Sequence, residues 1–180
     1  MQFINTPLAG LLIIQPTVFE DSRGYFFESY NRNLFKQNGI AVEFAQDNQS
    51  LSQKNVLRGL HFQNPPFAQG KLVRVIQGAV LDAVVDIRKK SATYGQSFAY
   101  ELNEMNKTMM WIPVGFAHGF LTLKNNTIFS YKCTEIYNKE SEDAILWNDP
   151  DINIKWGINK PALSEKDTKA KLFKDFISLF

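Results

Sequence analysis

The stretch GAVLDAVVDIR, residues 78–88, decides the fold class of this sequence. It is strongly apolar, and its only acids are Asp82 and Asp86. A run of this kind indicates a strand that is buried on both faces of a sheet. Further short β-type runs lie on either side of it, with turn residues rather than long helices between them. This spacing favours an antiparallel sandwich or barrel over a fold of alternating strands and helices.

The remaining expected elements are short. The other strands are expected at residues 11–14, 25–27, 42–45, 56–62, 71–76, 97–102, 108–112, 119–123 and 127–132. One helix is expected over residues 31–38, with Gly39 as its C-terminal stop. A second is expected over residues 164–176, where Ser164 and Asp167 resemble a capping box with Asp in place of Glu.

Composition limits the class of protein. The length of 180 residues suits one domain spanning residues 1–180, and a hydrophobic fraction of 44% is enough for a sizeable core. The formal net charge of +2 comes from nearly balanced acids and bases, which argues against disorder and against a nucleic-acid-binding surface. No apolar stretch approaches the roughly 20 residues of a membrane-spanning helix, and the first basic residue is Arg23. We therefore expect a soluble, cytoplasmic protein.

Cysteine and histidine are too scarce for the commonest metal sites. The single Cys133 cannot form an internal disulfide, and His61 and His118 are the only histidines. These residues cannot build a three-histidine zinc site or a cysteine-rich one. The sequence also lacks the glycine spacing of a dinucleotide or phosphate loop and the Gly-x-Ser-x-Gly pattern of a nucleophile elbow. Metal and nucleotide-cofactor chemistry are therefore disfavoured.

Two polar clusters have ordinary structural explanations. Arg23 and Glu28 lie among aromatic residues, where a charged pair is more often a salt bridge at a sheet edge than a ligand contact. Gln46 and Asn48 point to the same face of a strand, because side chains alternate with a period of two. In isolation, such amides more often satisfy neighbouring backbone groups.

A third cluster surrounds His61. The period of two places His61 and Gln63 on one side, and Arg58 joins them if Gly59 permits a bulge. Taken alone, His61 is more often a hydrogen-bonded core histidine than a site residue. His118, the only other histidine, is expected in a loop containing two glycines, and loops often carry function.

Three further residues also have simple interpretations. Lys71 is interpreted as a solvated strand end, and Asp167 as a helix cap. Tyr131 alternates with apolar neighbours, so its ring is expected in the core and its hydroxyl is the group of interest.

Taken together and in order, these segments resemble the dTDP-4-dehydrorhamnose 3,5-epimerase family. The matching stretches are FEDSRGYFFES (19–29), QDN (46–48), VLRGLHFQ (56–63), AQGKLVR (68–74), DIR (86–88), SATYG (91–95), WIPVGFAHGF (111–120), ILWND (145–149) and LSEKD (163–167). They extend over almost the whole chain, so chance is a poor explanation.

The resemblance implies a mainly β fold, a cupin-type jelly-roll β-sandwich with short peripheral helices, that binds no metal and assembles as a homodimer. Members of the family use no cofactor. They epimerise C3 and C5 of dTDP-4-dehydro-6-deoxy-D-glucose to give dTDP-4-dehydro-L-rhamnose, in dTDP-L-rhamnose biosynthesis. The expected partners are this dTDP-4-keto-6-deoxy sugar and a second copy of the chain, with no nucleic acid and no membrane.

The resemblance also implies roles for four residues. His61 matches the family's general base, and Asp167 holds its imidazole in the correct tautomer. Lys71 matches the lysine that faces the developing oxyanion. Tyr131 matches the acid on the opposite face of the sugar.

Binding residues carry over in the same way. The positions that match the family's nucleotide-sugar site are Arg23, Glu28, Gln46, Asp47, Asn48, Arg58, Lys71, His118, Glu142 and Lys166. Arg58 and Lys166 suit a diphosphate, because charge-assisted bonds to phosphate are strong. The register at Glu142 could slip to Glu140, and Phe26 and Tyr137 are candidate stacking surfaces for thymine.

Three alternatives remain open at this point. Related cupins epimerise a single carbon or move the ketone between C3 and C4. A non-catalytic sugar-nucleotide-binding cupin is a second alternative, although simple binding does not need an acid–base set. A metal-dependent cupin oxygenase is the third.

Overall fold

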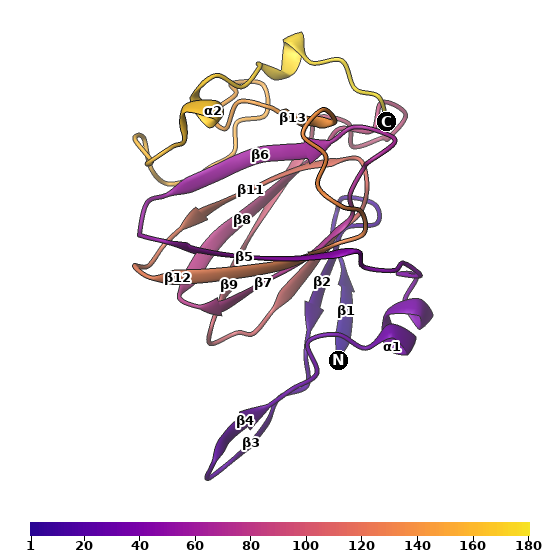
Figure 1. Cartoon of the computed structure of the whole chain (residues 1–180), viewed down its shortest axis with the longest axis vertical. Helices are drawn as coiled ribbons and strands as arrows, with labels where there is room; N and C mark the ends of the chain where they lie inside the picture. The colour runs from indigo at the N-terminus through magenta and orange to yellow at the C-terminus, as the bar shows by residue number, and fades with distance from the viewer.

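A computed structural model describes all 180 residues and shows two antiparallel sheets packed face to face (Figure 1). The first sheet has the order β1 (Gln2–Asn5), β2 (Leu12–Gln15), β10 (Met109–Ile112), β7 (Lys71–Gln77), β12 (Thr127–Cys133) and β5 (Gln46–Ser52). The second has the order β13 (Glu142–Ala144), β6 (Leu57–Gln63), β11 (Phe116–Thr122), β8 (Ala79–Asp86) and β9 (Ser97–Asn103). The eight strands β5 to β12 are in jelly-roll order, which confirms the expected fold class.

The core between the sheets follows from the alternation of side chains along each strand. On β8, Val80 and Val84 face the opposite sheet, whereas Ala83 and Val85 belong to a second apolar cluster on the outer face. Both faces of β8 are therefore buried, as its continuous apolar sequence predicts.

The outer faces of the two sheets are covered by different segments. The C-terminal part of the chain lies over the second sheet, where Trp147, Trp156 and Phe176 pack on its outer apolar cluster (Figure 1). Helix α1 (Arg32–Gln37) supplies the buried Phe35 to a third cluster with Ile14 and Trp111 of the first sheet. Helix α2 (Glu165–Thr168) and a 3₁₀ turn (Phe173–Asp175) lie within the C-terminal covering. No helix has the length and apolar character needed to cross a membrane.

One hairpin lies outside the sandwich. Strands β3 (Phe19–Asp21) and β4 (Gly24–Phe26) pair only with each other and project from the body as an arm (Figure 1). Phe19, Tyr25 and Phe26 on this arm are exposed.

The first helix forms as expected. The side chain of Asn31 accepts hydrogen bonds from two backbone amides of the first turn, and Gly39 follows the C-cap with φ +84°.

Three sequence expectations are wrong in detail. Residues 42–45 are irregular rather than a strand, because Val42 and Phe44 pack on the cluster around α1. The expected helix over 164–176 ends at Thr168, because the backbone of Lys171 accepts a hydrogen bond from Leu146 beside an isolated bridge to Ile145.

The third correction concerns the segment around His118. Its two glycines predict a loop, but β11 begins at Phe116 and pairs with β8 along its whole length. Gly115 occupies the turn, with φ +88°. Gly119 lies within the strand. The residue at this position is glycine because a Cβ there would lie 2.8 Å from the carbonyl oxygen of Arg58 and 3.0 Å from Cα of Gly59.

Candidate active site

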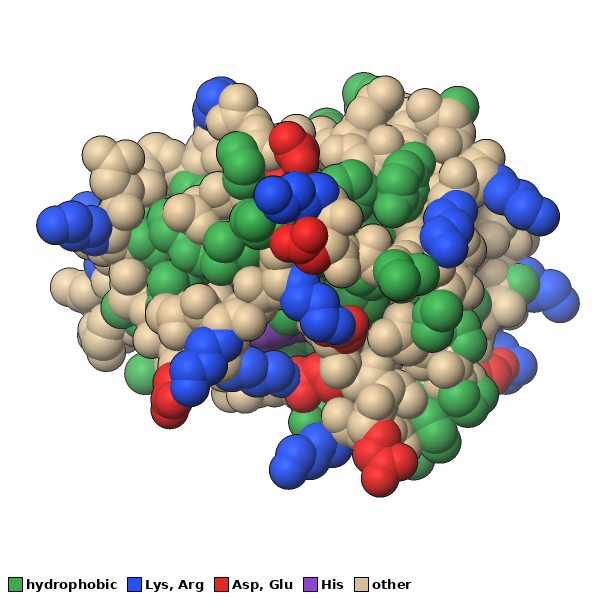
Figure 2. All heavy atoms as spheres, turned by 90° about the horizontal axis from the view of Figure 1, so that it is seen from above, with side chains coloured by type: hydrophobic (Ala, Val, Ile, Leu, Met, Phe, Trp, Pro, Cys, Tyr) green, Lys and Arg blue, Asp and Glu red, His purple; other side chains and the backbone are tan.

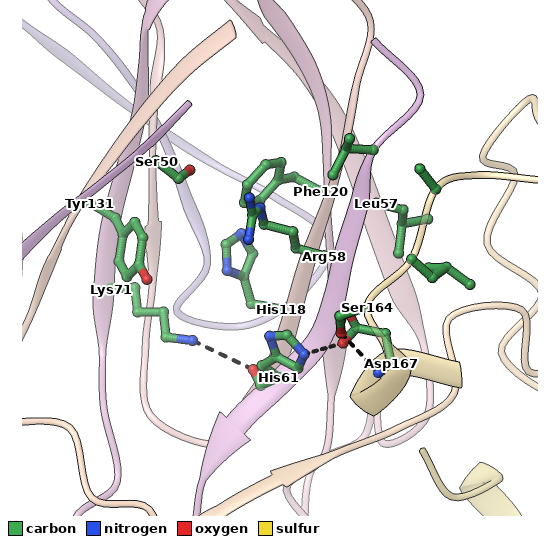
Figure 3. Close-up of a pocket in the computed structure, with 13 residues that line it drawn as sticks. Ser50, Leu57, Arg58, His61, Lys71, His118, Phe120, Tyr131, Ser164 and Asp167 are labelled. Carbon is green, nitrogen blue, oxygen red and sulfur yellow. Dashed lines mark hydrogen bonds and ion pairs between the residues drawn. The ribbon is translucent and has the colours of Figure 1, made fainter. Parts of the chain in front are cut away.

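The inward-facing side chains become polar toward one end of the sandwich, where a pocket of about 440 Å³ opens between the sheets. Ser50, Lys71 and Tyr131 come from the first sheet, and Arg58, His61 and His118 come from the second (Figure 3). The segment from Ala162 to Asp167 closes one side. In the space-filling view, a histidine is visible in a hollow bordered by basic and acidic side chains (Figure 2). This volume is in the range of small-molecule sites.

A bulge at Gly59 brings Arg58 and His61 to the same face. His61 pairs with His118 and Arg58 pairs with Phe120, so β6 has one residue more than β11 over this interval. Gly59 has φ +134°, and a Cβ on it would lie 2.4 Å from Cα of Gly119. Only glycine fits there, and the bulge on which the placement of Arg58 beside His61 depended is present.

His61 is held by a carboxylate from a distant part of the chain. Its Nε2 lies 2.5 Å from Oδ1 of the buried Asp167, and the Ser164 hydroxyl donates to Oδ2 at 2.7 Å (Figure 3). Because a carboxylate only accepts, Nε2 carries the proton, and Nδ1 is left as the basic nitrogen of the neutral ring.

The environment of Asp167 favours its ionised form. Burial acts to raise the pKa of Asp167, but hydrogen bonds from His61 and Ser164 outweigh it and hold the pKa below the ordinary value. Ser164 also caps α2 by accepting from the Asp167 amide at 3.1 Å. The capping interpretation is therefore confirmed for Ser164, while the carboxylate of Asp167 accepts the hydrogen bond from His61.

Lys71 and Tyr131 face His61 from the opposite sheet. The Lys71 ammonium lies 3.5 Å from the carbonyl oxygen of His61. Burial lowers the pKa of Lys71, and Cys133, Asp82 and Glu142 oppose that effect. The Tyr131 ring packs at 6.0 Å from Phe129, as expected of a core ring, and burial raises the pKa of its phenol. Tyr131 is therefore a neutral hydroxyl that can donate a proton.

Arg58 and His118 form the inner wall of the pocket. The guanidinium of Arg58 donates to the hydroxyl of Ser52 at 3.1 and 3.3 Å. Nε2 of the buried His118 lies 3.0 Å from both carboxylate oxygens of Asp82. Burial raises the pKa of Asp82, and the nearby His118 partly offsets this effect.

A second hollow shares His61, Lys71 and Tyr131 with the first, so the two lie next to each other. Gln46 and Asn48 both face it and are joined by a hydrogen bond of 2.9 Å, which confirms their expected common face. Glu142 accepts from the Tyr137 hydroxyl at 2.8 Å and forms an ion pair with Lys166. Glu142 rather than Glu140 therefore lies at the pocket.

Sequence reasoning missed several lining residues. Ser50 and Gln69 line the two hollows, and the buried hydroxyl oxygen of Ser50 has no hydrogen-bond partner. The period of two from Gln46 and Asn48 could have identified Ser50. Nowhere do three or more His, Cys, Asp or Glu side chains gather in a group suited to a metal ion.

Comparisons with known proteins agree on one family. The family described as dTDP-4-dehydrorhamnose 3,5-epimerase matches residues 5–175. The enzyme of that name from Salmonella typhimurium is 52% identical over 174 residues, covering 96% of this chain and 95% of the relative. The one from Shigella flexneri is 49% identical, covering 97% of each chain. The chain belongs to the dTDP-4-dehydrorhamnose 3,5-epimerase family.

A solved structure shows the same fold with a ligand. The dTDP-6-deoxy-D-glucose-3,5-epimerase of Legionella pneumophila, in complex with dTDP-4-keto-L-rhamnose, superposes with a TM-score of 0.94 at 46% identity. The alignment covers 98% of this chain and 94% of that one. The sandwich is therefore the cupin-type fold of the epimerase family, and the protein is a nucleotide-sugar isomerase by family.

Not every residue matched to the epimerase family lies in the pocket of this single chain. Arg23 is on the projecting arm, paired with Asp21 at 2.6 Å rather than with Glu28. Glu28 follows the arm and accepts from Asn31 at 3.1 Å, so the expected pair between Arg23 and Glu28 is wrong.

Two further residues face away from the pocket. Asp47 lies on the outer face of β5, where it pairs with Lys132 at 2.9 Å. Phe26 is exposed on the arm, whereas Tyr137, the other candidate stacking residue of the epimerase family, lines the second hollow.

Proposed function

We propose that this protein epimerises C3 and C5 of dTDP-4-dehydro-6-deoxy-D-glucose to give dTDP-4-dehydro-L-rhamnose. The observation that carries the proposal is the opposed placement of a base and an acid. His61 with Asp167 lies on one sheet side of the pocket, and Tyr131 lies on the other, with the Lys71 ammonium beside them (Figure 3).

The reaction needs only proton transfers. C3 and C5 flank the C4 ketone, so the carbanion formed by removing either proton delocalises onto the ketone oxygen. Nδ1 of His61 accepts the proton, and the Asp167 carboxylate stabilises the imidazolium that results. No electron enters or leaves the substrate, so this chemistry requires no redox cofactor.

Lys71 and Tyr131 complete the cycle. The Lys71 ammonium stabilises the negative charge on the enolate oxygen, a contribution on the order of 10²–10³ in turnover for preorganised donors. Tyr131 then donates its hydroxyl proton to the carbon from the face opposite His61, which inverts the centre. Solvent returns a proton to the phenolate and removes the one from His61.

The polar walls suit a nucleoside diphosphate. We assign the diphosphate to Arg58 and Lys166, and place Gln46, Asn48, His118 and Glu142 around the nucleotide sugar. Lys166 forms an ion pair with Glu142, and a phosphate group can compete with this carboxylate for the lysine.

We also propose that the protein acts as a homodimer. Arg23 and Phe26 project on an arm whose exposed aromatic side chains favour contact with another surface. In a dimer, the arm of one subunit can reach the pocket of the other, which would bring Arg23 and Glu28 to a nucleotide that they cannot reach in their own chain.

The test is NMR of the dTDP-4-keto sugar incubated with the protein in D₂O. We expect deuterium at both C3 and C5 and conversion to the L-rhamno product. Label at a single carbon identifies a mono-epimerase, and movement of the carbonyl to C3 identifies a ketoisomerase. Binding of dTDP without any exchange identifies a non-catalytic binding protein.

A further inference from the structure

Asp82 is a fully buried carboxylate that the proposed proton transfers do not use. It lies in the middle of β8 and faces the interior between Val80 and Val84. A carboxylate in such an apolar place is costly unless it is hydrogen-bonded or paired with a cation. Its hydrogen-bonding partner in this fold is His118 of the pocket, and the charge of Lys71 also acts on it.

The first partner is the ring of His118. Phe120 is directly opposite Asp82 across β11 and β8, so His118 is its diagonal neighbour. Both carboxylate oxygens lie 3.0 Å from Nε2, and the ring stands beside Phe120 and Phe129 at centroid distances of 6.4 and 6.2 Å. Since a carboxylate only accepts, Nε2 carries a proton, and Nδ1 is the acceptor of the neutral ring.

The second group on which the charge of Asp82 acts is Lys71, which comes from β7 on the opposite sheet and lines the same pocket as His118. The titratable groups whose charge acts on its ammonium are Cys133 on β12, Asp82 on β8 and Glu142 on β13, and His61 and Tyr131 line the pocket beside it. Burial lowers the pKa of Lys71, and negative charge nearby opposes that effect.

The two carboxylates near Lys71 are not equivalent. Glu142 already pairs with Lys166 and accepts from Tyr137. Asp82 forms no ion pair with a lysine or arginine and is fully buried, so its charge acts on Lys71 with little screening by water.

We propose that Asp82 is a positioning residue for the proposed epimerisation. Its carboxylate holds His118 in the Nε2–H form and supplies the negative charge that keeps Lys71 an ammonium ion beside the enolate oxygen. This inference rests on the proposed function, because Lys71 matters only if an enolate forms in the pocket.

The pH dependence of kcat tests the effect on Lys71. Asp82→Asn keeps the shape of the side chain and removes its charge, so we expect the alkaline limb of the profile to move to lower pH by about one unit. At a fixed pH on that limb, this shift lowers kcat about tenfold.

Asp86→Asn is the matched control. Asp86 is an equally buried carboxylate on the same strand, but it accepts hydrogen bonds from Arg88, Ser91 and Thr93 outside the pocket. Its profile should overlay that of the wild type.

A structural role for Asp82 predicts a different result. It lowers kcat of Asp82→Asn by the same factor at every pH, and that outcome overturns the proposal. A wild-type protein with no deuterium exchange at C3 or C5 overturns the proposed function instead, and nitrogen-15 spectra of the imidazoles then decide the role of Asp82 at His118.

Nitrogen-15 NMR of the imidazoles provides a readout independent of activity. The chain has only two histidines, so two ring spin systems are expected. In the wild type, His118 should show the Nε2–H tautomer, and Asp82→Asn should change the His118 signals while leaving those of His61 in place. A wild-type His118 in the Nδ1–H tautomer overturns the proposal, even if Asp82→Asn does not fold.

Discussion

His61 and Tyr131 differ in how their polar atoms are engaged within the chain. His61 donates one ring proton to Asp167 and keeps its second nitrogen available, whereas the Tyr131 hydroxyl has no hydrogen-bond partner and a raised pKa. These surroundings fit the proposed roles, proton removal by His61 and proton donation by Tyr131. Replacing each in turn should therefore separate exchange from inversion.

Substitution of His61 should abolish exchange but not binding. Asn is the suitable replacement, because its amide can still donate to Asp167 and spare the buried carboxylate. We expect kcat of His61→Asn to fall by about 10²–10⁴-fold, the usual contribution of a general base. Deuterium exchange by NMR checks the loss, and calorimetric titration with dTDP checks that binding is retained. Unchanged exchange would remove His61 as the base.

Tyr131→Phe should leave exchange and remove inversion. The ring still packs beside Phe129, so the stability should change little, but the hydroxyl proton is gone. His61 can still remove a proton and return a deuteron from the same side. NMR should therefore show deuterium in the substrate with little epimerised product. Normal yields of inverted product would contradict the assignment of Tyr131 as the acid.

At the scale of elements, the bulge in β6 and the end of β8 decide which side chains enter the pocket and which support the sandwich. One additional residue at Gly59 turns both Arg58 and His61 inward. At the end of β8, Asp86 accepts hydrogen bonds from Arg88, Ser91 and Thr93 and anchors the following turn. Each feature depends on a single residue and can be tested by one substitution.

Gly59→Ala should damage both stability and activity. A Cβ there lies 2.4 Å from Cα of Gly119, a contact that requires two strands to separate. We expect a loss of about 2 kcal/mol or more in urea unfolding, with a lower kcat because Arg58 and His61 are displaced. Gly24→Ala is the matched control, since Gly24 has a similar φ of +125° but nothing within 4 Å of the added carbon. Equal losses in the two variants would show that backbone conformation alone matters.

The lowered pKa of Asp86 predicts that Asp86→Asn and the wild type differ in their free energy of unfolding by an amount that depends on pH. Burial acts to raise its pKa, but hydrogen bonds from Arg88, Ser91 and Thr93 outweigh this and lower it from 3.8 to about 2. A pKa lowered in the folded state stabilises the protein above the unfolded-state value, and the effect is lost as the pH falls through the folded-state value. Asp86→Asn should therefore cost about 2 kcal/mol at pH 7. The difference from the wild type, measured by urea unfolding, should shrink between pH 4 and pH 2; a difference independent of pH would contradict the assignment.

At the scale of the whole molecule, most residues of the proposed site lie in the sandwich, but Arg23 and Phe26 lie on the arm, which projects from the sandwich. Arg23 and Phe26 are exposed on a hairpin that pairs with no other strand. A second subunit that receives this arm would account for both the exposed aromatic residues and the distance of Arg23 from its own pocket.

Mixing two defective variants should restore activity. We expect His61→Asn to lack the base and Arg23→Ala to have a raised KM. In a heterodimer with exchanged arms, one pocket has both an intact His61 and an intact Arg23. After equal mixing and reassociation, about a quarter of all pockets should be complete. Sedimentation should show dimers, and activity no greater than the sum of the separate variants would contradict an arm that acts on the partner.

The sequence alone predicted the strands and the family, because both depend on local patterns. Apolar runs such as residues 78–88 and alternation along β5 and β12 are visible over a few residues, and the family resemblance pointed to His61, Lys71 and Tyr131 together. The prediction of a strand at residues 42–45 was wrong because tertiary packing outweighed the local β preference. Val42 and Phe44 pack on the apolar cluster around α1 instead.

The family resemblance already implied that Asp167 holds His61, but the contact itself spans 106 positions and depends on the tertiary structure. The contact of Asp82 with His118 across 36 positions has no signal in the sequence, and it forms because strands of a jelly roll bring remote segments side by side. The glycines around His118 predicted a loop, yet the strand forms because two glycine-containing strands approach more closely than any side chain allows. Local periodicity determines which face a residue occupies on its own strand, whereas partners across the pocket depend on how the two sheets pack.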